Sequence, residues 1–239
     1  MKKTTAKQEN FGQQDNRQEK GRLDRRNFLK IAGAGAAGVA MYGLASCKKN
    51  DDGPDMGGDG LYFGSGDIAI LNYAYALEQL EAAFYIELVN KPYSGINDWE
   101  KTLFSDIRDH EIAHREFFKT ALGKNAIANL EFNFSSINFS SRESVLATAK
   151  AFEDLGVSAY NGAGWLIKEE AYLVLAGKIV SVEARHAALV RDLIDNGTFA
   201  NSEVVDDNGL DIAYSPTKVL ETAASFINSK IDVRDLPTY

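Results

Sequence analysis

Two of the three histidines in this chain follow a glutamate by three residues, and both pairs fall inside apolar stripes of helical period. The pairs are Glu111-Ile-Ala-His114 and Glu183-Ala-Arg-His186. Residues three apart lie on the same side of a helix, so each pair would point a carboxylate and an imidazole into the core. A buried carboxylate without a partner is costly or protonated. The chain must therefore fold into helices whose core compensates this charge, and a bound cation would do so.

Two further segments carry acidic residues on an inward-facing stripe. The inward positions are Leu71, Ala74, Glu78, Glu81, Tyr85 and Leu88 in the first, and Leu146, Ala149, Glu153, Gly156 and Tyr160 in the second. Each segment has a glutamate seven residues before a tyrosine, Glu78 before Tyr85 and Glu153 before Tyr160. Aligning these two segments, and likewise the two Glu-x-x-His motifs, predicts a duplicated helix pair.

This combination of motifs resembles the ferritin-like superfamily of carboxylate-bridged two-metal bundles. In that superfamily two helices each supply a glutamate and the other two each supply a Glu-x-x-His pair. More closely, four segments within residues 67–230 resemble the bacterial ferritin-like domain related to desiccation-associated proteins: Leu71 to Tyr85, Phe152 to Tyr160, Val182 to Ala188 and Ser215 to Leu220. The resemblance implies an all-α fold, a four-helix bundle with a long crossover between its second and third helices.

The resemblance also implies a set of six metal ligands. These are Glu78, Glu111, His114, Glu153, Glu183 and His186. Glu111 and Glu183 would bridge two metals, Glu78 and Glu153 would be terminal, and one histidine would bind each metal. Glu81 lies one turn from Glu78 on the same side, so it could be the true ligand, an extra ligand or an acceptor that orients an imidazole. We favour Glu78 because it alone matches Glu153 and has a tyrosine seven residues later.

Several other residues near these motifs have simpler explanations. Tyr85 and Tyr160 are expected to be core aromatics with satisfied hydroxyls rather than redox participants. His110 points about 100° away from the neighbouring glutamate on the helix, which predicts a surface or supporting position rather than ligation. Gly156 and Gly177 are mid-helix and cost roughly 1 kcal/mol each relative to alanine, so close approach of another helix is their simplest explanation.

The N-terminal segment predicts export. Arg25-Arg26-Asn27-Phe28-Leu29-Lys30 resembles the twin-arginine export motif, and the uncharged stretch Ile31 to Ser46 follows it, so residues 1–46 are read as a signal peptide. The stretch ends at Leu44-Ala45-Ser46-Cys47, which resembles a bacterial lipobox, where cleavage precedes a lipidated cysteine. Cys47 is the only cysteine, which excludes an intrachain disulfide and a thiolate metal site. We expect a bacterial cell-envelope protein, periplasmic or an outer-membrane lipoprotein, held to the membrane by an N-terminal lipid anchor.

The remaining domain boundaries follow from composition. Residues 47–66 are rich in glycine and aspartate and predict a flexible linker, residues 67–230 form the bundle, and residues 231–239 are a C-terminal tail. Without the signal peptide the net charge is about −13. This charge argues against nucleic acid and anionic lipid headgroups as partners and would attract cations. No feature of the sequence predicts an oligomeric state.

The pattern predicts helices over residues 67–90, 98–122, 141–160 and 169–194, with a short fifth helix near 216–228. Expected start signals are Asp67, Asn97-x-x-Glu100, Ser140-x-x-Glu143 and Ser215-Pro216. Residues 123–140 lack helical period. Extended, they reach at most about 60 Å, enough to run along helices of about 35 Å as the crossover. Residues 195–215 are expected to be a surface loop.

The ligand chemistry limits the possible functions. Four carboxylates would neutralise two divalent ions, and oxygen and nitrogen ligands without sulfur suit iron or manganese. The leading hypothesis is a site with two iron ions that reacts with O2 or peroxide, as a ferroxidase or a peroxide-consuming oxidoreductase. The alternatives are a manganese catalase-like enzyme with two manganese ions, and a non-enzymatic envelope protein of stress or desiccation in which metal stabilises the fold.

Overall fold

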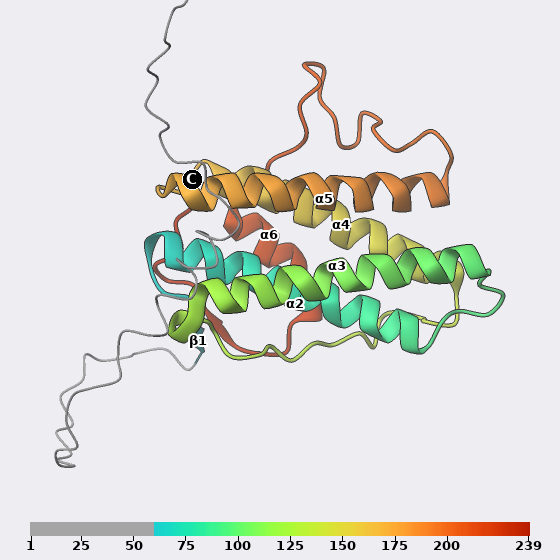
Figure 1. The fold of residues 1–239 in the computed structure, drawn as a ribbon, viewed down its shortest axis with the longest axis horizontal. Coiled ribbons are helices and arrows are strands. Elements are labelled where there is room, and N and C mark those ends of the chain that lie inside the picture. Colours follow the sequence, from blue (N-terminus) through green and yellow to red (C-terminus); the bar gives the residue numbers. More distant parts are fainter. Residues whose placement is uncertain (1–59) are drawn as a thin grey trace, which may run out of the picture. The chain divides into compact units, whose positions relative to one another are not determined.

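The computed structural model describes residues 60–239, and in this part of the chain the architecture is a helical bundle. Its four long helices are α2 (Gly66–Asn90), α3 (Asp98–Leu122), α4 (Arg142–Gly164) and α5 (Glu170–Ile194). Helices α2 and α3 pack as one antiparallel pair, and α4 and α5 pack as a second (Figure 1). The predicted all-α class, the four-helix bundle and the crossover are therefore confirmed.

Three of the four predicted start signals lie at or within one residue of the observed helix caps. The prediction for Asp67 is wrong, because Ser65 is the N-cap of α2, and the Asp67 carboxylate instead accepts hydrogen bonds from the backbone N–H groups of Lys168 and Glu169. Asn97 accepts a hydrogen bond from the backbone N–H of Glu100, and Ser215 caps the short helix α6 (Pro216–Ala223). Helix α4 is capped by Ser141 rather than Ser140, and it continues to Gly164, four residues beyond the prediction. After α6 the chain tightens into the 3₁₀ turn η2 (Ala224–Phe226) instead of continuing as a helix to residue 228.

Helix α2 is the central helix of the bundle. Almost every residue from Ala69 to Tyr85 is buried, whereas α3 and α5 bury only one stripe. A helix that is buried on all sides must have neighbours all round. It packs against α3 and α4, and the crossover covers a further side.

The crossover is attached to α2 by two buried amide side chains. It begins with the 3₁₀ turn η1 (Gly123–Asn125) and then runs extended along the bundle, so α3 and α4 point the same way (Figure 1). The side chain of Asn72 accepts a hydrogen bond from Ile127 N–H and donates to the Asn125 carbonyl, and Gln79 accepts from Leu130 N–H. These bonds satisfy backbone groups that an extended segment on a helix would otherwise leave unpaired.

The two ends of the described chain meet at one side of the bundle. Strand β1 (Leu61–Tyr62) pairs in parallel with β2 (Ile231–Asp232), and Phe63 next to it is fully buried. This strand pairing differs from the predicted boundaries, in which the flexible linker extends to residue 66 and residues 231–239 are a C-terminal tail. Strands of two residues are too short to show a period in the sequence.

The loop after α5 is attached through one buried arginine. Arg191 forms a two-pronged ion pair with Asp154 of α4, at 2.8 and 2.7 Å, and also contacts Asn201 and Glu203. Paired hydrogen bonds between a guanidinium and a carboxylate are among the stronger polar contacts. They join α5, α4 and the loop 195–215.

None of the described helices is both long enough and apolar enough to cross a bilayer. The predicted signal peptide, with Arg25 and Arg26, and the predicted lipidation site Cys47 lie outside the described residues.

Candidate metal centre

The structure brings all six predicted ligands to the middle of the bundle, from four different helices. They are Glu78 of α2, Glu111 and His114 of α3, Glu153 of α4, and Glu183 and His186 of α5. The four glutamates have no exposed surface. The helical register places each of them where neighbouring turns carry core hydrocarbon, and so each carboxylate points inward.

The six side chains form two overlapping groups. Glu78, His114, Glu111 and Glu183 make the first, and Glu153, His186, Glu111 and Glu183 make the second; within each group the potential ligand atoms lie within 4.8 Å of one another. The two groups share Glu111 and Glu183, one carboxylate from each Glu-x-x-His pair. This geometry can hold two cations side by side with two shared carboxylates.

His114 faces the first group with its Nδ1 atom. This nitrogen lies 2.8 Å from Glu183 Oε1, 3.4 Å from Glu78 Oε2 and 3.6 Å from Glu111 Oε2. Three carboxylates from three helices therefore surround one imidazole nitrogen. The closest of them belongs to the opposite helix pair.

His186 repeats this arrangement in the second group. Its Nδ1 atom lies 2.8 Å from Glu111 Oε1, 3.5 Å from Glu153 Oε2 and 3.7 Å from Glu183 Oε2. The duplication predicted from the motifs is thus visible as an approximate twofold relation between the two halves of the centre.

The inward-facing atoms of the centre are close together without forming hydrogen bonds. Those without a partner are Glu78 Oε2, Glu111 Oε1 and Oε2, His114 Nδ1, Glu153 Oε2, Glu183 Oε1 and Oε2, and His186 Nδ1. Nitrogen and oxygen atoms at 2.8 Å that are not directed at each other can instead be directed at a common third atom. Buried polar atoms are rarely left unsatisfied, so this donor set fits two bound cations.

Protonation compensates the buried negative charge where no cation does. Burial alone would lower the pKa values of His114 and His186, but the surrounding carboxylates outweigh it and raise both to about 12. Burial likewise opposes ionisation of Glu111, but its contacts with the two imidazoles prevail and lower its pKa to about 2.

Glu78 and Glu153, which each belong to only one group, have pKa values shifted upward, in the opposite direction from that of Glu111. Burial raises the pKa of Glu153 to about 8, against the effect of His186. Burial and the negative charge of Glu183 raise the pKa of Glu78 well above its usual value. The centre therefore takes up protons and would exchange them for metal ions.

Two tyrosines hold Glu78 and Glu153 from across the bundle. The Tyr160 hydroxyl of α4 donates to Glu78 Oε1 of α2, and the Tyr85 hydroxyl of α2 donates to Glu153 Oε1 of α4. Each carboxylate then has one oxygen fixed by a tyrosine and the other facing the centre. The expectation that both are core aromatics with satisfied hydroxyls agrees with these contacts.

Glu81 lies beside the two groups but belongs to neither. It is buried, its Oε2 has no hydrogen-bond partner, and burial together with the charge of Glu183 raises its pKa well above the usual value. A Cβ atom added at Gly156 would lie 2.8 Å from Glu81 Oε1. Gly156 therefore leaves room for a carboxylate and not for a helix backbone. The prediction that another helix approaches closely at Gly156 is therefore wrong. It is also wrong for Gly177, where no atom lies within 4 Å of an added Cβ atom.

His110 contacts His186, and the other half of the centre has no residue that corresponds to it. Its Nδ1 atom lies 2.9 Å from His186 Nε2, and the two rings are stacked 6° from parallel with centroids 5.2 Å apart. A hydrogen bond at Nε2 leaves Nδ1 of His186 facing the carboxylates. The aligned position in α5 is Val182. Sequence reasoning foresaw a supporting position for His110 but not its partner, since that contact depends on how α3 and α5 face each other.

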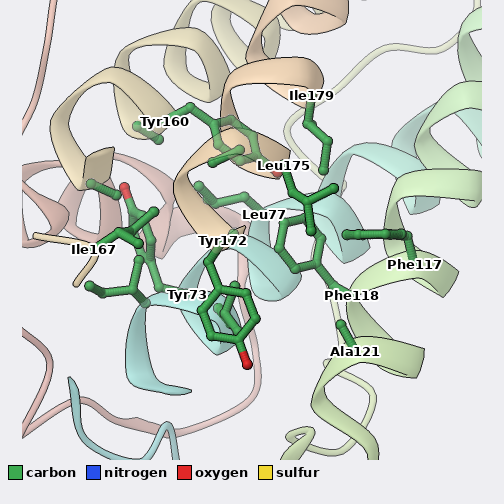
Figure 2. Close-up of a pocket in the computed structure, with 16 residues that line it drawn as sticks. Tyr73, Leu77, Phe117, Phe118, Ala121, Tyr160, Ile167, Tyr172, Leu175 and Ile179 are labelled. Carbon is green, nitrogen blue, oxygen red and sulfur yellow. The ribbon is translucent and has the colours of Figure 1, made fainter. Parts of the chain in front are cut away.

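One feature of the core was not predicted from the sequence, an apolar cavity next to the centre (Figure 2). The sequence signal that could have indicated this cavity is the small size of several lining residues, Ala74, Ala159, Ala163 and Ala176. Alanine is common in helices for other reasons, so the signal has little weight by itself.

Comparison with known families agrees with the geometry. The ferritin-like domain family matches residues 66–196, which include all four long helices and all six side chains of the centre. A twin-arginine translocation signal matches residues 22–41, which contain Arg25 and Arg26. No curated protein matches this chain significantly.

Proposed function

The chain belongs to the ferritin-like family, and from this premise we propose that it is an exported oxidoreductase that binds two iron ions between its four helices. The single observation that carries the proposal is the pair of overlapping ligand groups, whose inward atoms are buried and lack hydrogen bonds. Glu111 and Glu183 would be shared by both ions. Glu78 with His114, and Glu153 with His186, would complete the two positions.

The charges of the centre support divalent ions. Four carboxylates balance the charge of two divalent cations, so the occupied cluster would be neutral and could stay buried without a large desolvation penalty. Carboxylate and imidazole donors without sulfur suit iron and manganese. In such a neutral cluster, Glu78 and Glu153 would also keep the positions in which the tyrosine hydroxyls hold them.

Two ferrous ions there would supply two electrons, which with two protons reduce O2 to hydrogen peroxide or reduce hydrogen peroxide to water. The protein's own contribution is position and environment. Tyr85 and Tyr160 hold the terminal carboxylates, His110 orients His186, and the surrounding core excludes bulk water. Ferroxidase and peroxide-consuming activity are both consistent with this chemistry.

Anaerobic titration with ferrous ion tests the proposal. We expect two ions per chain for the wild type and loss of at least one for Glu111→Gln, because that carboxylate belongs to both groups. The matched control is Glu116→Gln, which changes an exposed glutamate of the same helix that pairs with Arg115. A wild type that binds no ferrous ion would contradict the proposal.

Two other assignments are outcomes of the same experiments. Native protein that contains two manganese ions and releases oxygen from peroxide would be a manganese catalase-like enzyme. Native protein that binds metal but turns over neither ferrous ion nor peroxide would be a non-enzymatic envelope protein, of the kind connected with stress or desiccation.

The translocation signal directs the chain across the membrane to the cell envelope. We further propose that Cys47 becomes the lipidated first residue of the mature protein, because it follows the lipobox-like segment Leu44-Ala45-Ser46. Mass spectrometry of the mature N-terminus checks this proposal. We expect acylated Cys47, and release of Cys47→Ser from the membrane fraction; an unmodified cysteine would contradict it.

A further inference from the structure

An apolar cavity lies between the four helices, at the end of the bundle where α2 and α5 begin and α3 and α4 end. Figure 2 shows its side chains reaching in from all four helices. The residues that the argument uses are Ala74, Phe118, Tyr160, Tyr172, Ala176 and Ile179. Its walls are almost entirely carbon.

The cavity adjoins the candidate metal centre. Ala74 is four residues before Glu78, and Ile179 is four residues before Glu183, so each lies one helical turn from a ligand. Tyr160 belongs to both features, because its ring lines the cavity while its hydroxyl holds Glu78. Along α2 and α5, the cavity lining and the ligands are therefore one helical turn apart.

Along α3 and α5, the exposure of the lining residues decreases toward the centre. Tyr172 and Ala176, in the first turns of α5, are half-buried, and Ala121 at the end of α3 is exposed. Phe118 and Ile179, next to the ligand layer, are buried. The cavity is therefore nearer to solvent on its α3 and α5 side at the end of the bundle, and enclosed where it meets the centre. On the α2 and α4 side, the lining residues Ile70, Tyr73 and Ala163 are buried at that same end.

The size and polarity of the cavity favour one class of occupant. Its volume is about 30 Å³, more than the roughly 10–15 Å³ that one water-sized molecule needs. Hydrogen peroxide would lose its hydrogen bonds with water there, at a cost of about 2–7 kcal/mol for each unpaired polar group. A small apolar molecule has no such penalty, and apolar protein cavities bind xenon.

We propose that this cavity binds dioxygen beside the centre and delivers it along the bundle axis. The proposal rests on the function proposed above and narrows its oxidant from dioxygen or peroxide to dioxygen. It assigns the apolar residues at the start of α5 a role in access to the centre.

Xenon tests the cavity without any metal or turnover. In crystals of the metal-free protein under xenon pressure, we expect a xenon atom between Phe118, Tyr160 and Ile179. Ala176→Leu should remove this site, because the larger side chain fills the cavity, and Ala171→Leu is the matched control at a half-buried alanine of α5 outside it. Leu175→Ala, which enlarges the cavity, should increase xenon occupancy. It tests the cavity even if Ala176→Leu does not fold.

The ferrous-loaded protein gives the second measurement. In Ala176→Leu we expect oxidation by dissolved O2 to slow several-fold, with oxidation by hydrogen peroxide and the number of ferrous ions bound unchanged from Ala171→Leu. Absence of xenon from the cavity, or equal slowing with both oxidants, would overturn the inference. Failure to bind iron would instead contradict the proposed function, because the xenon measurement does not depend on metal.

Discussion

Tyr85 of α2 donates its hydroxyl to Glu153 of α4, a residue of the other helix pair. Tyr160 makes the reciprocal bond to Glu78. In the sequence each tyrosine follows the glutamate of its own helix by seven residues, but in the structure it holds the glutamate of the other. Burial and the adjoining carboxylates raise the pKa of both tyrosines well above the usual value, so both remain neutral donors. The two halves of the centre are thus held together by each other's side chains.

Removing one of these hydroxyls should affect one metal position. Tyr85→Phe leaves Glu153 Oε1 without its donor, and we expect affinity for one of the two ions to fall about 10–100-fold, as for other residues that support metal ligands. Isothermal titration with ferrous or cobalt ion measures this. Tyr75→Phe is the control, because Tyr75 is a buried tyrosine of the same helix whose charged neighbours are Glu116 and Arg115 rather than the residues of the centre. Equal weakening of both ions would argue against separate positions.

Paired substitutions distinguish Glu78 from Glu81 as the α2 ligand. Glu78 belongs to a ligand group and Glu81 does not, so Glu78→Gln should reduce the stoichiometry from two ions to one, while Glu81→Gln should retain both. Both variants preserve side-chain size. The reverse result in metal analysis would identify Glu81 as the ligand.

Gly156 should matter because it makes room for Glu81. The Cβ atom of Gly156→Ala would lie 2.8 Å from the Glu81 carboxylate, so we expect destabilisation by about 1–3 kcal/mol, typical of overpacking. The double variant with Glu81→Ala should recover most of it, since contacting residues couple. Chemical denaturation of the four proteins measures the cycle. Gly177→Ala, where no atom is near, should instead stabilise α5 by up to about 1 kcal/mol.

The contact between His110 and His186 predicts an asymmetric effect. His110→Ala removes the partner of His186 Nε2, and we expect weaker binding of the ion in the second group only, by about 10–100-fold. The visible spectrum of the cobalt-loaded protein would show which position empties first. His110→Gln should retain part of the affinity, because its amide can still form a hydrogen bond. Unchanged binding in both variants would show that the contact does not orient the ligand.

Metal binding should release protons. The pKa values of His114 and His186 are raised to about 12, so both imidazoles are protonated at pH 7 in the metal-free protein and each must lose a proton to bind a cation through Nδ1. Affinity should therefore increase with pH through the neutral range. Titration calorimetry in two buffers of different ionisation enthalpy counts the protons. Identical heats in both buffers would contradict this prediction.

The same raised values affect the stability of the metal-free protein. Because each imidazole binds its proton more tightly in the folded state, its contribution to the free energy of unfolding is fully present below the unfolded pKa of about 6.5. The contribution decreases as pH rises toward about 12.

The helices and the six inward-facing side chains could be predicted from the sequence because their signals are local. Apolar residues and ligands recur every three or four positions, and capping residues such as Asn97 lie beside the helix that they begin. The duplication also showed which glutamates correspond. These signals need no knowledge of how one helix is rotated or placed against another.

The contacts between helices were decided by the tertiary structure. The exchange of tyrosines, the room that Gly156 leaves for Glu81 and the stacking of His110 on His186 all depend on the rotation and separation of packed helices. The apolar cavity and the pairing of β1 with β2 likewise join segments distant in the sequence. Helical period determines which face of a helix turns inward, but only packing determines which atoms it meets there.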